Sequence, residues 1–181
     1  MNDVFRTITS KRDTRVFSTR PLDPGALDRI TQAARMAGSA KAAQPVRLII
    51  VTDQAQKDRL AECGDFTSHV RTCQAAVAIV LVPEAGVVGA PFAIFRGPFD
   101  AGRAAQNMML TAWAEGIASC PASMHNAEAA AKVLGLPPGH VVANVIAFGY
   151  PTASGDPVTG TRPRIPVENF AAPERWPGEW E

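Results

Sequence analysis

The sequence predicts a single α+β domain in which a central mixed β-sheet is flanked by helices. Three short runs rich in apolar and β-branched residues indicate strands, and they lie at 46–52, 75–82 and 141–148. Helical periodicity appears outside these runs, most extensively over residues 100–116. Because helices and strands alternate along one chain, we expect the strands to share one sheet.

The first predicted helix covers residues 26–37. A Leu-Asp-Pro-Gly sequence at 22–25 supplies turn chemistry before it, and Gly38 ends it. The next two elements are the strand VRLIIVT at 46–52 and the strand AAVAIVLV at 75–82. Both are expected to be covered on two faces.

The longest predicted helix covers 100–116, with Asp100 as its N-cap. Its apolar stripe is too wide for a surface helix, so we expect it to be the central buried helix. A shorter helix is predicted over 127–134, and the last strand ends at the Gly-Tyr-Pro sequence of 149–151.

Two segments lack periodicity, namely 83–98 and the proline-rich tail 151–181. A long loop inside a compact domain is often a lid or a binding loop, and 83–98 is interpreted in this way. The tail contains Trp176 and Trp180 but cannot build a core of its own. We therefore expect one domain, 1–181, whose tail covers another surface, such as that of a partner subunit.

Composition excludes several classes of function. Eighteen Lys and Arg face 17 Asp and Glu, so no global field favours nucleic acid or an anionic membrane. The three cysteines form no Cys-x-x-Cys pair, which indicates a reducing cytoplasm. No stretch approaches the roughly 20 apolar residues that span a bilayer. A cytoplasmic protein is the prediction.

Two cation clusters could hold a phosphate. Lys11, Arg12 and Arg15 lie within five residues, and Arg162 and Arg164 flank a proline in the tail. Each cluster taken alone is more typical of a solvated surface, and the two gain meaning only together. Polar residues at 39–45 join a helix to a strand, where a ligand could reach them, although an ordinary connection would look the same.

Other chemistries lack their motifs. The segment after the long helix has no Gly-x-Ser-x-Gly, and Cys120 is interpreted as a packed small residue. His69, His125 and His140 have no metal-ligand spacing. Neither Gly-x-Gly-x-x-Gly nor a phosphate-loop motif occurs, which argues against doubly wound dehydrogenases and phosphate-loop enzymes.

Five motifs occur in the order typical of the FMN-dependent nitroreductase family, and the resemblance covers the chain from about residue 6 to 166. SKRDTRVF at 10–17 resembles the family's Ser-Arg-Arg-Ser-x-Arg-x-Phe, and 39–45 resembles its Ser-x-x-Asn-x-Gln-Pro-Trp element. Residues 100–121 resemble its long helix followed by Gly-x-x-Ser-x-Pro. The Gly-Tyr-Pro of 149–151 and the tail arginines resemble its last two motifs.

This resemblance implies a three-layer homodimer with FMN at the subunit interface. The flavin would take hydride from NADH or NADPH and pass electrons to an organic acceptor, such as a nitroaromatic or a quinone, in a ping-pong cycle. No side chain is then needed as a catalyst, because the flavin carries the hydride at N5. The partners implied are a second copy of the chain and small molecules.

The resemblance also implies the residues that bind FMN. Those around the phosphate and the ribityl chain would be Lys11, Arg12, Asp13, Arg162 and Arg164. Arg15 would approach the pyrimidine edge and stabilise the anionic reduced ring. The turn between helix and strand would supply Ser39, Lys41 and Gln44, some of them across the dimer interface. The other side of the flavin would be lined by Pro121, Ala122 and Ser123.

Three departures from the family pattern leave other functions open. Asp13 replaces the commoner Ser, Ala42 replaces Asn, and Val46 replaces Trp. The Arg-Asp-x-Arg sequence at 12–15 also resembles the branch that consumes reduced FMN to make 5,6-dimethylbenzimidazole. The changes at Ala42 and Val46 motivate a third hypothesis, a flavin-binding protein without a substrate pocket.

Overall fold

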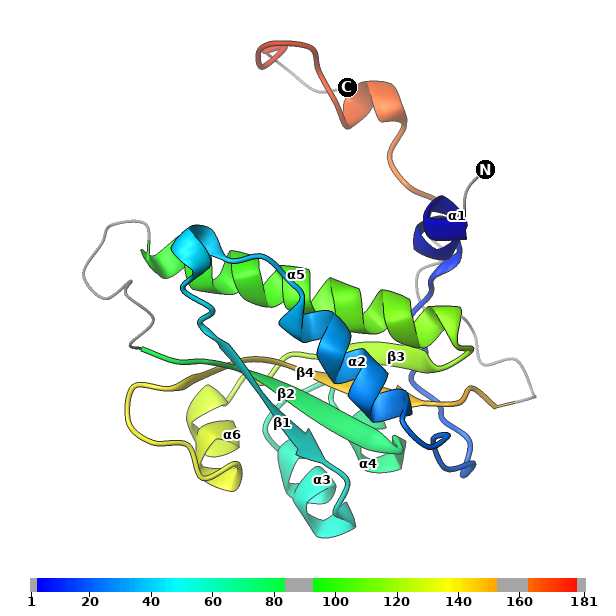
Figure 1. The fold of residues 1–181 in the computed structure, drawn as a ribbon, viewed down its shortest axis with the longest axis vertical. Coiled ribbons are helices and arrows are strands. Elements are labelled where there is room, and N and C mark those ends of the chain that lie inside the picture. Colours follow the sequence, from blue (N-terminus) through cyan, green and yellow to red (C-terminus); the bar gives the residue numbers. More distant parts are fainter. Residues whose placement is uncertain (1–2, 84–92, 153–162, 179–181) are drawn as a thin grey trace.

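The computed structural model describes residues 3–83, 93–152 and 163–178, and its core is a four-stranded sheet between two layers of helices (Figure 1). The strand order is β1-β2-β4-β3. The bounds of the strands are β1 Val46–Val51, β2 Ala75–Leu81, β3 Ala118–Ala122 and β4 Val141–Gly149. The expected three-layer α+β fold is confirmed.

These four strands pair antiparallel throughout, for example with Ile49 opposite Ala78 and Ala76 opposite Ala147. The parallel component of the expected mixed sheet is a single isolated bridge, between Asp13 and Ser119. No strand was predicted from the sequence at 118–122, but these residues form an edge strand. An edge position tolerates Pro121, because the missing N–H there costs no bond on the open side.

One face of the sheet is covered by α2, Ala26–Arg35, and by the long helix α5, Ala93–Ala114 (Figure 1). Ile30, Met108 and Phe148 are fully buried between these helices and the sheet. Arg29 also donates to both carboxylate oxygens of Glu115, at 2.7 and 2.8 Å, and this ion pair lowers the pKa of Glu115. It ties α2 to the C-terminal end of α5.

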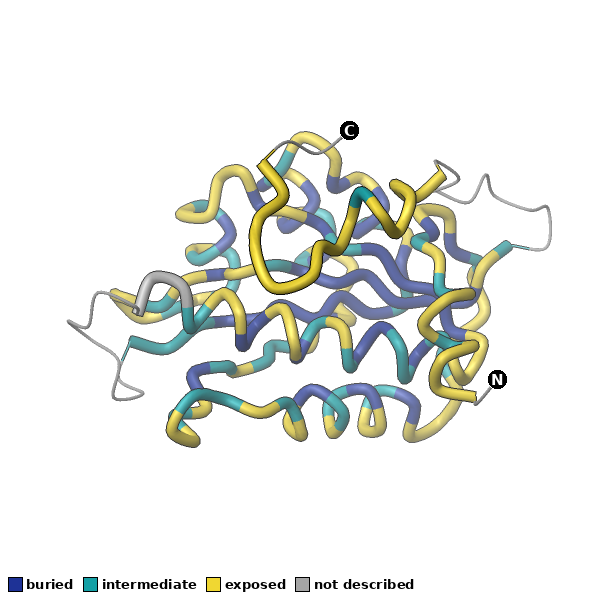
Figure 2. The backbone as a smooth tube through the Cα atoms, turned by 90° about the horizontal axis from the view of Figure 1, so that it is seen from above, coloured by how far each residue is buried: buried dark blue, intermediate teal, exposed yellow. Residues whose placement is uncertain are grey.

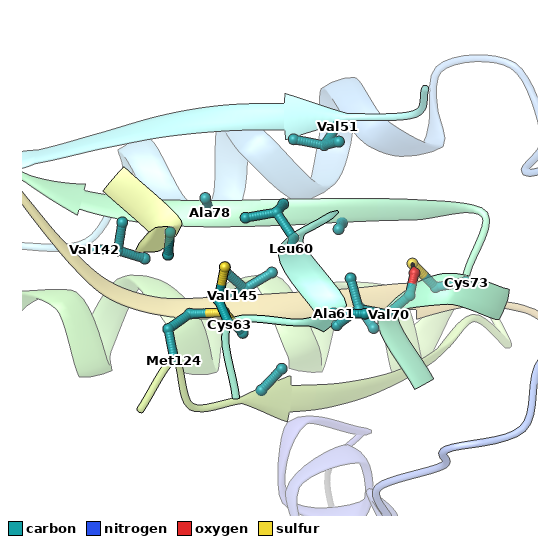
Figure 3. Close-up of a cluster of buried hydrophobic side chains, with 14 of the residues drawn as sticks. Val51, Leu60, Ala61, Cys63, Val70, Cys73, Ala78, Met124, Val142 and Val145 are labelled. Carbon is teal, nitrogen blue, oxygen red and sulfur yellow. Dashed lines mark hydrogen bonds between the residues drawn. The ribbon is translucent and has the colours of Figure 1, made fainter. Parts of the chain in front are cut away.

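Three short helices cover the opposite face, namely α3 Gln54–Ala61, α4 His69–Thr72 and α6 Ala127–Val133. Leu60, Val70 and Val145 are fully buried in the second core cluster on this side (Figure 3). Neither α3 nor α4 was predicted from the sequence. The Asp53 carboxylate accepts a hydrogen bond of 2.9 Å from the Gln56 backbone and so caps α3.

Two expectations about α5 were wrong. The helix begins at Ala93, so the described end of the predicted 83–98 loop is helical. Asp100 lies inside the helix with 4% of its surface exposed and is not the N-cap. Pro98 lies in the second turn of this helix, where its missing N–H removes one bond of the helical ladder. The remainder of the predicted loop, 84–92, lies outside the described residues.

The two ends of the chain lie away from the sheet (Figure 1). Helix α1, Asp3–Ser10, has no buried residue, and the tail is exposed at almost every described position around the short helix η2, Val167–Asn169 (Figure 2). Large apolar side chains at both ends are exposed, at Phe5, Phe170 and Trp176. None of the described helices is long and apolar enough to cross a bilayer.

Candidate functional site

A cavity of about 460 Å³ lies between the segment after α1, helix α5 and strand β3. We call it the cation-lined cavity. It brings together six of the residues expected to bind FMN, which are Lys11, Arg12, Asp13, Arg15, Pro121 and Arg164. Another hollow near Cys63 and His125 is larger, about 700 Å³, but no Lys or Arg lines it. Of these two, the cation-lined cavity is therefore the better candidate for an anionic ligand.

The backbone of residues 13–18 is fixed to the sheet at two points. The Thr14 N–H donates to the Ser119 carbonyl at 3.1 Å, and the Ser18 N–H donates to the Tyr150 carbonyl at 2.8 Å. Between these points Phe17 is buried against Gly149, where an added Cβ would lie 2.9 Å from a Phe17 ring carbon. This close packing holds Asp13 and Arg15 at the mouth of the cavity beside β3.

The charge of the cavity is strongly unbalanced in a chain that is nearly neutral as a whole. Four cations face one carboxylate among its lining residues, which leaves three positive charges in surplus. Lys11 pairs with Asp13, and its Nζ lies 3.7 Å from the Met109 sulfur. The Arg12 guanidinium donates to the carbonyls of Thr9 and Lys11 at 2.9 and 2.8 Å. Such a cluster is suited to a phosphate.

Cys120 and Pro121 form the β3 wall of the cavity. Cys120 is 3% exposed, and its burial raises the pKa of the thiol, although the nearby Arg15 opposes this effect. The thiol therefore stays protonated and is not an activated nucleophile. This agrees with the interpretation of Cys120 as a packed residue, although its place at the ligand site was not predicted from the sequence.

Ile8, Gln106 and Met109 also line the cavity and were not predicted as site residues. Met109 was assigned to the buried stripe of the long helix, and it does pack there with 8% of its surface exposed. Gln106 lies one turn earlier on α5. The spacing of three residues predicts that Gln106 and Met109 are neighbours on one helix face. It does not predict that this face borders a ligand cavity.

The turn between α2 and β1 lies at a different cavity, of about 600 Å³, which Ser39 and Gln44 line together with Arg35 and Arg47. The Gln44 N–H donates to Ser39 Oγ at 2.9 Å and closes this turn. Lys41, Ala42 and Gln44 have φ of 54°, 54° and 49°, in a region that non-glycine residues rarely adopt. Within one subunit, this strained turn does not line the cation-lined cavity.

The remaining expected residues are dispersed. Ala122 is buried, and its N–H donates to Asn144 Oδ1 at 3.2 Å. The Ser123 carbonyl lies against Gly64, where an added Cβ would approach it to 2.5 Å. Arg162 lies outside the described residues. No group of three or more potential metal ligands occurs in the described ranges.

The fold and the cavity agree with what the comparisons with known proteins found. The model of the nitroreductase family matches residues 8–63 and 65–150. The chain belongs to the nitroreductase family. It is thus an oxidoreductase, as the sequence predicted.

The relatives are distant but cover most of the chain. A protein of Archaeoglobus fulgidus, assigned as an NADH dehydrogenase/NAD(P)H nitroreductase, is 28% identical over 86% of this chain and 90% of its own. The NADPH-flavin oxidoreductase of Vibrio harveyi is 26% identical over 92% of this chain and 72% of its own. A Desulfovibrio desulfuricans structure, assigned as a nitroreductase and solved with FMN, has a TM-score of 0.81 and 25% identity. That match covers 98% of this chain and 99% of the other.

Proposed function

We propose that this nitroreductase binds FMN in the cation-lined cavity and carries electrons from NADH or NADPH to an organic acceptor, such as a nitroaromatic or a quinone. The reaction would follow a ping-pong cycle. The observation that carries the proposal is the convergence of Lys11, Arg12, Arg15 and Arg164 on one cavity. The names of the Vibrio harveyi relative and the Desulfovibrio desulfuricans structure support the choice of FMN and of a nicotinamide donor.

The residues present suit the parts of FMN. The surplus of positive charge fits a phosphate that carries up to two negative charges. Lys11, Arg12 and Arg164 would hold that group by charge-assisted hydrogen bonds, each contributing about 1.5 to 3 kcal/mol where it is well formed. Asp13 is a poor neighbour for a phosphate, and its carboxylate would accept instead from ribityl hydroxyls.

When bound, FMN would supply the redox chemistry, and the protein would bind it, orient it and tune its charge. Arg15 would lie at the pyrimidine edge and stabilise negative charge there. The wall formed by Cys120 and Pro121 would fix one side of the ring system. No activated nucleophile is required, which is consistent with the raised pKa of the Cys120 thiol.

We further propose a homodimer in which each cofactor site is completed by the other subunit. Ser39, Lys41 and Gln44 would then contribute from one protomer to the cation-lined cavity of its partner, as the resemblance to the family implies. Apolar side chains of α1 and of the tail are exposed and provide surface for such an assembly, as at Val4 and Phe170.

The deciding experiment is titration of the purified apoprotein with FMN, followed by NADH or NADPH oxidation with a quinone or a nitroarene. We expect stoichiometric binding, a flavin spectrum and steady turnover. An intact fold that does not bind stoichiometric FMN would contradict the proposal. Binding without turnover would instead favour the flavin-binding protein without a substrate pocket.

Asp13 favours a second candidate function, because it lines the cation-lined cavity within the Arg-Asp-x-Arg sequence at 12–15. In that alternative, reduced FMN is the substrate, and oxygen converts it into 5,6-dimethylbenzimidazole. Aerobic incubation with excess reduced FMN and chromatography of the products separates the two. Recovery of intact FMN supports the reusable cofactor, and stoichiometric loss of FMN to a benzimidazole supports the alternative.

A further inference from the structure

His69 is a buried side chain with no hydrogen bond of normal geometry. It begins helix α4 and is 3% exposed, and neither of its ring nitrogens has a partner among the described residues. The Oγ of Ser119 on strand β3 is also buried and unpartnered there. Buried polar atoms almost always have partners, so such an exception requires a physical explanation, of which a catalytic or redox role is one.

The His69 ring lies directly behind the wall of the cation-lined cavity. Backbone groups of Phe66, Cys120 and Pro121 are close enough to favour its protonated form, and the charge of Arg15 is close enough to disfavour it. Cys120, Pro121 and Arg15 all line the cavity itself. The imidazole therefore lies beside residues that line the cavity without lining it itself.

Opposing effects set the charge of this ring. Burial, followed by repulsion from Arg15, lowers the pKa of His69, while the three backbone groups raise it. The ring is therefore neutral near pH 7. A negative charge placed on the cavity side of Arg15 would offset the repulsion and shift the balance toward imidazolium.

Other ionisable groups near α4 are engaged elsewhere or uncharged. On α3, the buried Lys57 donates to the Cys73 carbonyl at 2.6 Å. Asp58 and Glu62 face Arg71, at 3.9 and 3.4 Å. In the adjoining loop Asp65 pairs with His125 at 3.1 Å, and on β3 the Cys120 thiol is protonated. Within the described part of the chain, Arg15 is thus the charge that acts on His69.

We propose that His69 is a redox-linked proton acceptor. Its imidazole is neutral while the bound flavin is oxidised, takes one proton from water when the flavin is reduced, and releases that proton on reoxidation. The inference rests on the proposed function. The nicotinamide hydride brings two electrons and one proton to the flavin and leaves one negative charge on it. The proton on His69 balances that charge, so no further oxidant or reductant is needed.

The test is the midpoint potential of bound FMN between pH 5.5 and 8.5 in the wild type and in His69→Gln. For a two-electron couple, each linked proton adds about 30 mV per pH unit to the slope. We expect the wild-type slope to exceed that of His69→Gln by up to this amount over part of the range. His140→Gln is the matched control, since His140 lies before β4 and contacts the Pro138 carbonyl, and its slope should equal that of the wild type.

A second measurement needs no variant of His69. Imidazole NMR signals of the wild-type holoenzyme should show His69 titrating at a higher pH with reduced flavin than with oxidised flavin. Equal slopes in the wild type and His69→Gln, or the same His69 pKa in both redox states, would overturn the inference while the proposed function stands. If the folded wild type binds no FMN, the proposed function fails, and this inference fails with it.

Discussion

Lys11 and Asp13 form an ion pair inside a cavity whose other charged residues are all cations. The Lys11 side chain is only 11% exposed, so its ammonium is held beside one carboxylate and among three guanidinium groups. Arg12, Arg15 and Arg164 are exposed residues, so water screens part of their mutual repulsion, and a bound anion would offset the rest. At the scale of single residues, the surplus charge of the cavity therefore fits a ligand with more than one negative charge.

Removing the tail cations tests this argument. The double variant Arg162→Ala/Arg164→Ala should bind FMN at least tenfold more weakly, because charge-assisted hydrogen bonds contribute about 1.5 to 3 kcal/mol each and are not additive. Fluorescence titration of the apoprotein measures the Kd. Arg175→Ala is the control, since Arg175 is an exposed cation of the same tail that does not line the cavity. An unchanged Kd in the double variant would assign both arginines to the solvated surface.

Protonation of His69 should also destabilise the apoprotein. Its folded pKa is lowered from the ordinary 6.5, mainly by burial, so below that pH the unfolded chain binds more protons. The free energy of unfolding should fall as the pH drops below about 6.5. The total loss should be about 1.4 kcal/mol for each pH unit by which folding lowers the pKa of His69. Thermal unfolding of the wild type and His69→Gln from pH 5 to 8 measures this. If His69→Gln loses as much stability as the wild type between pH 8 and pH 5, the assignment to His69 is contradicted.

At the scale of elements, the long apolar strands were predictable and the short strand β3 was not. Apolar runs identified β1, β2 and β4, but only β2 is buried along nearly its whole length. The expectation that β1 is covered on both faces was wrong, because β1 is an edge strand in which Arg47 and Ile50 are exposed. Strand β3 is five residues long, with a proline, and only its pairing with β4 makes it a strand. Helix α3 is largely polar, and its one local indication is the Asp53 cap. The Gly-Pro pair at 97–98 is unfavourable inside a helix, so the sequence did not predict that α5 begins before it.

The same limit applies to the site. The family motifs predicted six of the residues that line the cation-lined cavity. Gln106 and Met109 were missed because a helical pattern identifies a face but not what lies opposite it. His69 was not predicted as a site residue, and its place beside β3 follows from tertiary packing alone. Local sequence therefore predicted the charged part of the site better than its walls.

The contact between the 13–18 segment and β4 provides a test at this scale. Gly149→Ala should destabilise the fold by about 1 to 3 kcal/mol, because the new Cβ would meet the buried Phe17 at 2.9 Å. Since Phe17 anchors the segment that carries Asp13 and Arg15, FMN affinity should fall as well. Urea unfolding and FMN titration measure the two effects.

Gly102→Ala is the matched control for that substitution. Gly102 is exposed on α5, and nothing lies within 4 Å of an added Cβ. Alanine there should leave FMN binding unchanged and stabilise the helix by about 0.5 to 1 kcal/mol. Equal stability of Gly149→Ala and the wild type would show that Phe17 moves at no cost, and that the segment is held by other contacts.

For the whole molecule, the exposed apolar ends are the feature that a single subunit does not explain. Phe170 and Trp176 are 73% and 70% exposed, and the tail that carries them extends beyond the body of the domain (Figure 1). Burying a large side chain contributes about 1.5 to 3 kcal/mol, so a partner surface that covered several of them would stabilise an assembly considerably.

We therefore expect sedimentation of the wild type at micromolar concentration to give a dimer. The double variant Phe170→Ser/Trp176→Ser should weaken the dimer at least tenfold, and FMN binding should weaken with it, because the partner would complete each site. Val141→Thr, which changes an apolar side chain that is 51% exposed at the start of β4, should do neither. The variant's monomer should keep its secondary structure, since neither replaced side chain is buried within it. A wild type that sediments as a monomer with FMN bound would refute the shared site, and the turn at Ser39 and Gln44 would then have no role in binding the flavin.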